Sequence, residues 1–342
     1  MSREETNVPL LEVEDLVVEF RGETGVTRAV DGVSFSVREG EILGVVGESG
    51  SGKSVTAMSV MGLVPQPPGR ISGRVRLRGE ELTDAPERRW RRIRGKEVGM
   101  VFQDPMTALN PVHKVGRQIA EVMRVHDRRL SAADAKRRAV DLLRLVGVPN
   151  PEQRIDQYPH QFSGGMRQRA VIAMAIANDP GLLIADEPTT ALDVTIQAQV
   201  LDQLRRAQAE TGAATIFITH DLGVIAELAE RVLVMYAGRV MEEGDVAEIF
   251  RRPRHPYTVG LLGSLPSLRH DVDTLRPIPG SPPNLQQPAA GCPFQPRCAL
   301  GRDREVCRTT RPALTVVGSG HTSACHFADE LSATPQVGEV AR

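Results

Sequence analysis

The chain has 342 residues, which is enough for about two domains. Its 42 basic and 43 acidic residues leave a net charge of −1, so charge gives no reason to expect a nucleic-acid partner or an anionic membrane surface. No apolar run approaches the roughly 20 residues that a membrane-spanning helix needs. The acidic N-terminus lacks the apolar stretch of a signal peptide, so we expect a cytoplasmic chain with reduced cysteines.

The first part of the chain is predicted to form strands. Apolar and charged residues alternate over Leu10–Phe20, Val33–Val37 and Ile71–Leu77, as in the half-buried strands of an antiparallel layer. The apolar run Ile42–Val46 is typical of a buried strand, and Val55–Leu63 has helix-compatible spacing.

Between that strand and that helix lies a segment that matches the phosphate-binding P-loop pattern at every fixed position. Its residues are Gly47, Glu48, Ser49, Gly50, Ser51, Gly52, Lys53 and Ser54. The glycines allow successive backbone N–H groups to turn toward phosphates at the positive end of the helix dipole. Lys53 would reach the β- and γ-phosphates, and Ser54 would hold magnesium. The motif predicts that the chain binds a nucleoside triphosphate.

The middle of the chain has a helical segment, which is followed by alternating strands and helices. After a short apolar strand at Val98–Phe102, the pattern is helical from Pro105 to about Gln161, and Ser131 with Asp134 predicts a capped helix start. Apolar strands then alternate with helices, which favours a parallel sheet covered on both faces. These strands are predicted at Leu182–Asp186, Ala214–Ile218 and Arg231–Met235.

Two motifs lie a helix's length apart between residues 162 and 189. Residues Phe162–Arg169 read Phe-Ser-Gly-Gly-Met-Arg-Gln-Arg, and Leu182–Thr189 reads Leu-Leu-Ile-Ala-Asp-Glu-Pro-Thr. The pair resembles the signature peptide and Walker B strand of the ABC-type ATPases. Gln103, Thr190–Asp193 and His220 stand where that family has its Q-loop, D-loop and switch histidine.

The resemblance covers roughly residues 10–250 and implies the fold. We expect an α/β P-loop NTPase core, in which a parallel sheet is joined by an antiparallel β layer and a helical subdomain at about 105–170. The ABC ATPase domain would occupy residues 1–250, and residues 251–342 would form a C-terminal extension. The resemblance also implies a head-to-tail dimer with two ATP molecules between P-loop and signature.

The residue types suit the roles that the family implies. Asp186, at the end of a buried strand, would anchor magnesium together with Ser54 and Gln103. Glu187 would orient or deprotonate the attacking water, with Gln103 beside it as a further catalytic residue. His220 would donate to the γ-phosphate and stabilise the charge of the transition state.

Five further residues are expected at the nucleotide. Ser163, Gly164 and Gly165 form a donor-rich helix start that suits a phosphate bound to the other subunit. Asp193 belongs to the D-loop. Phe20 would stack on adenine as the family's A-loop aromatic does, although a strand aromatic can equally be a core residue.

Three segments resemble one branch of the family. Phe102–Pro111, Phe162–Arg169 and Arg254–Thr258 look like the D-type ATPase subunits of oligopeptide and dipeptide importers. The implied partners are two transmembrane permeases, a second homologous ATPase and an extracytoplasmic substrate-binding protein, on the cytoplasmic face of the cell membrane. Nickel importers share the pattern and remain an alternative, as do an importer of another small solute and a non-transport ABC ATPase.

The four cysteines gather near the C-terminus. Cys292, Cys298, Cys307 and Cys325 lie in a compact segment of a chain expected in the cytoplasm, which argues for a metal rather than disulfides. The spacing lacks the paired knuckles usual for structural zinc. Resemblance to peptide-importer ATPases with the same Gly-Cys-Pro-Phe-x-x-Arg-Cys pattern implies a 4Fe-4S cluster; zinc and free thiols or disulfides are the alternatives. The cluster would be structural, or it would sense redox state.

Overall fold

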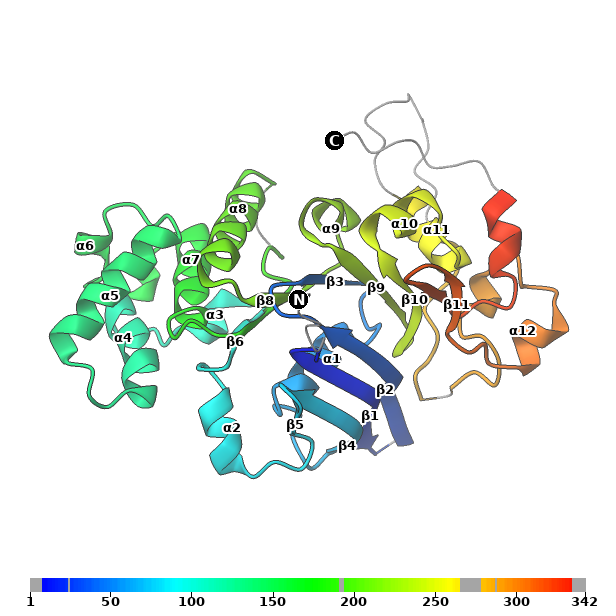
Figure 1. The fold of residues 1–342 in the computed structure, drawn as a ribbon, viewed down its shortest axis with the longest axis horizontal. Helices are drawn as coiled ribbons and strands as arrows, with labels where there is room; N and C mark the ends of the chain where they lie inside the picture. Colours follow the sequence, from blue (N-terminus) through cyan, green and yellow to red (C-terminus); the bar gives the residue numbers. More distant parts are fainter. Residues whose placement is uncertain (1–7, 24, 191–193, 265–277, 287, 334–342) are drawn as a thin grey trace, which may run out of the picture. The chain divides into compact units, whose positions relative to one another are not determined.

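The computed structural model describes residues 8–23, 25–190, 194–264, 278–286 and 288–333 (Figure 1). The chain divides into two compact units, each built from several segments. The first unit comprises residues 1–10, 37–41 and 84–218, and the second comprises residues 11–36, 42–83 and 219–342.

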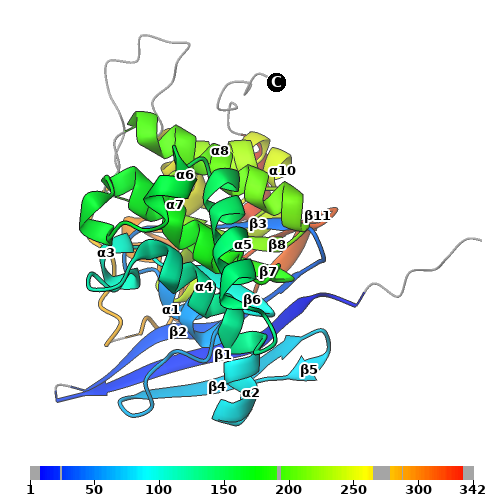
Figure 2. The same cartoon turned by 90° about the vertical axis from the view of Figure 1, so that its left-hand side faces the viewer.

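The second unit contains the predicted antiparallel layer. Its four strands lie in the order β2-β1-β4-β5 and run side by side in Figure 2. They are β1 (Leu11–Gly22), β2 (Gly25–Val37), β4 (Gly69–Leu77) and β5 (Glu80–Glu81). Leu11 of β1 lies opposite Leu77 of β4, and both side chains are buried. The predicted alternation is therefore confirmed.

A second group of strands in this unit carries the P-loop and part of the C-terminal extension. Strand β3 (Ile42–Val46) is parallel to β9 (Arg231–Tyr236), and β9 pairs antiparallel with β10 (Arg239–Asp245). The extension adds β12 (His321–Ser323) to β10, and β11 (Thr315–Gly318) to β12. These two last strands were not predicted.

Short helices complete the second unit. Helix α1 begins at Lys53, two residues before the predicted start. The described helices are α1 (Lys53–Val60), α9 (Leu222–Leu228), α10 (Val246–Arg251), α11 (Pro256–Gly263) and α12 (Glu305–Thr309), with the 3-10 helices η2 (Gln295–Arg297) and η3 (Ala328–Ala333).

The first unit contains the other parallel strands. Strand β7 (Leu182–Asp186) pairs in parallel with β6 (Val98–Val101) on one side and with β8 (Ala214–Thr219) on the other. All residues of the three strands are buried, as expected for a parallel sheet with both faces covered. The parallel arrangement predicted from the apolar runs is confirmed.

The predicted helical region also belongs to the first unit, and its helices lie close together in Figure 1. Helix α5 begins where the sequence predicted, because Ser131 Oγ accepts a hydrogen bond from the backbone N–H of Asp134. The helices of this unit are α2 (Glu87–Ile93), α3 (Pro105–Ala108), α4 (Val115–His126), α5 (Ala132–Leu145), α6 (Pro151–Arg154), α7 (Gly164–Ala175) and α8 (Val194–Thr211), with the 3-10 helix η1 (Pro159–Gln161).

Within the part of the chain that the structure describes, no helix combines the length and the apolar character needed to cross a membrane.

Candidate nucleotide-binding and cysteine sites

The P-loop turns sharply between β3 and α1, and two of its glycines leave no room for a side chain. A Cβ atom at Gly47 would lie 2.1 Å from the carbonyl oxygen of Met235. At Gly52, where φ is +102°, a Cβ would lie 2.6 Å from the carbonyl oxygen of Ala29. These positions require glycine for steric reasons, and the resulting turn leads directly into the N-terminus of α1.

The buried side chain of Lys53 folds back over this loop. Its Nζ donates hydrogen bonds to the carbonyl oxygens of Gly47, at 2.7 Å, and Glu48, at 3.0 Å. The ammonium group is thus held where the loop turns, as a P-loop lysine must be to meet a phosphate. Ser54 follows it in the first turn of α1 and is half-buried.

Glu48 has partners that the sequence did not predict. Its backbone N–H donates to the hydroxyl of Tyr257 at 2.8 Å. Its carboxylate accepts two hydrogen bonds from Arg297, at 2.7 and 2.9 Å. Glu48 raises the pKa of the Arg297 guanidinium above its ordinary value, chiefly by these hydrogen bonds. Because Arg297 lies 249 residues further along the chain, no local pattern could have revealed this pair.

Two other residues of the second unit are expected to contact the nucleotide, and neither is fully buried. Phe20 is half-buried on β1 and opposite Gly69 of β4, and a Cβ at Gly69 would lie 3.3 Å from its ring. His220 is exposed directly before α9, whose N-terminus is capped by the Asp221 carboxylate.

In the first unit, the structure brings Gln103 and Glu187 together. Gln103 Nε2 donates to Glu187 Oε2 at 3.1 Å, and Thr190 Oγ1 donates to the same oxygen at 2.9 Å. Glu187 has φ +47°, which is unfavourable for a residue with a side chain, and its N–H bonds to the carbonyl of Ile218. Asp186, at the end of β7, is buried. The carboxylate of Glu187 is thus held in a fixed orientation by two donors.

The signature segment starts helix α7. Ser163 is its N-cap and accepts a hydrogen bond from the N–H of Met166 at 3.3 Å. A Cβ at Gly164 would meet open space, whereas one at Gly165 would lie 2.8 Å from Ile196. Ser163 and Gly164 are exposed, so this helix start is accessible to a phosphate. Asp193 lies outside the described residues.

The four cysteines line one pocket in the second unit, which we call the cysteine pocket. Cys292, Cys298 and Cys307 are buried, Cys325 is half-buried, and none forms a disulfide. A Cβ at Gly301 would lie 2.9 Å from the sulfur of Cys307 and 3.4 Å from that of Cys298.

Two backbone N–H groups point at sulfurs of this pocket. Gly301 donates to Cys298 Sγ at 3.1 Å, and Phe327 donates to Cys325 Sγ at 3.4 Å. Burial above all, with a smaller contribution from the neighbouring cysteines, raises the pKa of Cys292 to about 11 and that of Cys325 to about 12. Across the described ranges, no group of three or more His, Cys, Asp or Glu side chains converges closely enough to hold a metal ion.

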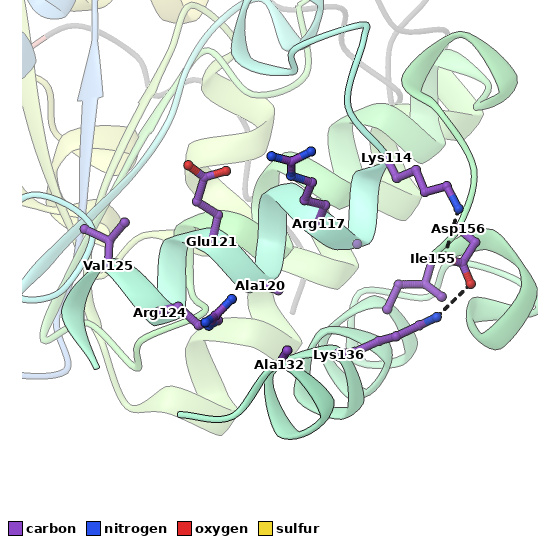
Figure 3. Close-up of a pocket in the computed structure, with 11 residues that line it drawn as sticks. Lys114, Arg117, Ala120, Glu121, Arg124, Val125, Ala132, Lys136, Ile155 and Asp156 are labelled. Atoms are coloured by element: carbon purple, nitrogen blue, oxygen red, sulfur yellow. Dashed lines mark hydrogen bonds and ion pairs between the residues drawn. The ribbon is translucent and has the colours of Figure 1, made fainter. Parts of the chain in front are cut away.

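The helical part of the first unit has a pocket of about 550 Å³ between α4, α5 and the turn that follows α6 (Figure 3). Lys114 and Lys136 both bond to Asp156 at one end, and Arg117, Glu121 and Arg124 project from α4. The lining combines these charges with apolar side chains, among them Val125, which is 65% exposed. Sequence reasoning gave no signal for this pocket.

Two protein-family models match separate parts of the chain. The model described as ABC transporter matches residues 30–190. The model described as oligopeptide/dipeptide transporter, C-terminal region, matches residues 241–307. Three of the four cysteines, Cys292, Cys298 and Cys307, lie within this second match.

Named relatives match nearly the whole chain. The oligopeptide transport ATP-binding protein OppD of Mycobacterium bovis is 55% identical over 93% of this chain, which spans only 52% of that relative. A probable peptide ABC transporter ATP-binding protein of Sinorhizobium fredii is 51% identical over 94% of this chain and 96% of the relative. The dipeptide transport ATP-binding protein DppD of Escherichia coli is 48% identical, over 93% and 96%.

Solved structures agree with these relatives. A dimeric ATP-binding cassette in a post-hydrolysis state, bound to ADP and phosphate, superimposes with a TM-score of 0.62 at 26% identity, covering 69% of this chain and 98% of that one. The expected ABC ATPase fold is confirmed. The chain belongs to the family of ATP-binding proteins of oligopeptide and dipeptide ABC transporters.

Proposed function

We propose that this chain hydrolyses ATP to energise uptake of oligopeptides or dipeptides through partner permeases. The observation that carries the proposal is the joint presence of the two matched regions, the ABC ATPase segment and the peptide-transporter C-terminal region, in a single chain. The relatives' names support peptides over nickel or another small solute. We take residues 1–250 as the ATPase domain, with its helical subdomain at about 105–170, and residues 251–342 as the extension.

In the proposed mechanism, the P-loop binds the phosphates of ATP through the backbone N–H groups of residues 47–54. Lys53 would give up its hydrogen bonds to the carbonyl oxygens of Gly47 and Glu48 and would bind the β- and γ-phosphates instead. Magnesium, when bound, would neutralise phosphate charge, with Ser54, Asp186 and Gln103 as the residues that hold it. Phe20 would stack on the adenine.

Glu187 would orient the attacking water and accept its proton. Its carboxylate is already fixed by hydrogen bonds from Gln103 and Thr190, so little reorientation is needed. His220 would donate to the γ-phosphate as negative charge develops. Ser163, Gly164, Gly165 and Asp193 would contact the nucleotide of a second ATPase subunit, which we infer is a homologous chain rather than a copy of this one.

The pocket of the helical region is where we place the permease contact (Figure 3). A short helix of a permease loop that offers apolar and acidic side chains would match Val125, Arg117 and Arg124. The chain itself would be peripheral at the cytoplasmic face of the cell membrane, held there by two permeases. An extracytoplasmic binding protein would deliver the peptide.

A cluster in the cysteine pocket is a further part of the proposal. Four sulfur ligands on one pocket, two of them accepting backbone N–H groups, suit thiolates that bind a 4Fe-4S cluster. A single zinc ion would need its ligands to converge on one point, and the described side chains do not. Zinc therefore remains the second candidate. The cluster, when bound, would cross-link the extension and would take no part in ATP hydrolysis.

The test is transport by the assembled complex in vesicles. The chain, its partner ATPase and its permeases would be reconstituted with the binding protein, and uptake of di- and pentapeptides would be compared with uptake of nickel. ATP-dependent peptide uptake that is lost in Lys53→Ala is the expected result. Uptake of nickel alone would replace the substrate assignment, and a complex that hydrolyses ATP without transporting either would contradict the importer assignment.

A further inference from the structure

An ion pair joins the C-terminal extension to the P-loop. Arg297 lies in η2, directly before Cys298, and its guanidinium forms the two-point hydrogen bond to the Glu48 carboxylate. The Arg297 side chain is only 6% exposed and that of Glu48 24%, so solvent screens the pair less than it screens a surface pair.

The guanidinium has further partners, both in the extension and on β9. Arg297 Nε donates to the carbonyl of Pro279 at 2.8 Å, and Nη1 donates to the hydroxyl of Tyr236 at 3.2 Å. Its charged group also lies over the rings of Tyr236 and Phe294, at 5.7 and 5.9 Å from their centres. A side chain held by so many partners presents its charge at a defined place.

Glu48 is at the same time bonded to the phosphate-binding apparatus. Its carbonyl oxygen accepts a hydrogen bond from Lys53, and its N–H donates to Tyr257, which is fully buried. Any movement of Glu48 therefore moves a carbonyl oxygen to which Lys53 donates a hydrogen bond. A carboxylate in the second position of an anion-binding loop also repels phosphate unless a cation neutralises it.

We propose that Arg297 is a positioning residue for nucleotide binding: it neutralises and holds Glu48, so the affinity of the P-loop for ATP depends on the docked C-terminal extension. The inference assumes that the P-loop binds ATP, as the proposed function states. ATP, which has one more negative charge than ADP, is the ligand more sensitive to loss of Arg297.

The test measures equilibrium binding of Mg–ATP and Mg–ADP to the full-length chain, with a fluorescent nucleotide analogue as the probe. Arg297→Gln is expected to weaken ATP binding about tenfold, within the usual range for coupling between two sites, and ADP binding less. Arg297→Lys, which keeps the charge but loses the two-point geometry, is expected to fall between that variant and the unaltered chain. In the assembled transporter, Arg297→Gln is expected to raise KM more than it lowers kcat.

Two further variants separate positioning from a general structural role. In Glu48→Gln/Arg297→Gln the repulsive charge is gone, so ATP binding is expected to return to within about threefold of the unaltered chain. Arg304→Gln removes another two-point pair of the extension, with Glu330 at 2.7 Å, and is expected to leave the nucleotide affinity unchanged.

Three results would overturn the inference. They are unchanged ATP affinity in Arg297→Gln, a double variant as weak as that single variant, and an equal loss in Arg304→Gln. Thermal unfolding of each variant shows whether the extension remains folded. If the unaltered chain itself binds no ATP, the proposed function fails instead, and the two failures are thereby distinguished.

Discussion

Gln103 Nε2 donates a hydrogen bond to Glu187 Oε2 at 3.1 Å, which joins the second residue after β6 to the first residue after β7. The two strands are parallel neighbours, so their carboxyl ends bring both side chains to one edge of the sheet. Gln103 leads into the helical region. A displacement of that region would therefore move Gln103 and, through this hydrogen bond, the Glu187 carboxylate that is proposed to activate water.

Replacement of the catalytic carboxylate tests this arrangement. Glu187→Gln keeps the size and the hydrogen bond from Thr190 but cannot accept a proton from water. We expect ATP hydrolysis to fall at least about 100-fold, while ATP still binds with an affinity within a few fold of the unaltered chain. Hydrolysis is measured as phosphate release and binding by equilibrium titration. A variant that still hydrolyses ATP at an appreciable rate would show that another group activates the water.

The P-loop, its strand and the parallel strands were predictable because each depends on neighbours in the sequence. The apolar run of Ile42–Val46 needs only to be buried, and the glycines of the loop answer local steric demands at Gly47 and Gly52. Strands β11 and β12 were missed because they are short, and β11 is largely exposed. The pair of Arg297 with Glu48 is missed for another reason: a contact over 249 residues leaves no periodic signal.

Phe20 offers a test of the adenine assignment. The half-buried ring has one edge against Gly69, and stacking would use a face of the ring. We expect Phe20→Leu to weaken ATP binding about tenfold with little loss of stability, because leucine still fills the strand position, and Phe20→Tyr to bind normally. If both variants bind ATP as the unaltered chain does, Phe20 is a core residue only.

The pocket of Figure 3 predicts a charge-dependent contact with a permease. Arg124→Glu reverses a charge at its edge, and we expect this variant to hydrolyse ATP alone at the normal rate but to copurify with the permeases at a several-fold lower yield. Arg308→Glu, on α12 of the second unit and exposed, is the matched control. Equal copurification of both variants would mean that the permease docks elsewhere.

A buried acid joins the extension to the core of the second unit. Glu242 on β10 accepts hydrogen bonds from His321 Nε2, at 2.7 Å, and from the backbone N–H groups of Arg254 and His255, at 2.5 and 3.0 Å. Glu242→Ala leaves these donors without a partner, so we expect the free energy of unfolding to fall by about 3 kcal/mol. Denaturant unfolding measures it.

The control for that substitution is Glu330→Gln, which removes a carboxylate from an exposed pair of the same extension. Exposed pairs contribute little, so we expect a loss under about 1 kcal/mol. An equally small loss in Glu242→Ala would show that water takes the place of the carboxylate as partner of these donors.

The cysteine pocket allows a prediction of the metal content of the chain. The space beside Gly301 is taken by two sulfurs, since a Cβ there would lie 2.9 Å from Cys307 Sγ and 3.4 Å from Cys298 Sγ. Gly301→Ala must therefore displace at least one sulfur, whereas Gly318→Ala, in the same extension, would meet its nearest neighbour at an ordinary 3.5 Å. Iron, sulfide and zinc are measured on protein purified without oxygen.

We expect the unaltered chain and Gly318→Ala to contain about four irons and matching sulfide with a broad visible absorption band, and Gly301→Ala to contain less than half of each. Cys298→Ser is expected to behave like Gly301→Ala, because the serine hydroxyl is a poor ligand for iron. Zinc in a one-to-one ratio would identify the site as a structural ion site. Equal iron in Gly301→Ala and Gly318→Ala would show that the iron is bound away from the pocket, since the crowding at Cys307 and Cys298 would then have had no effect.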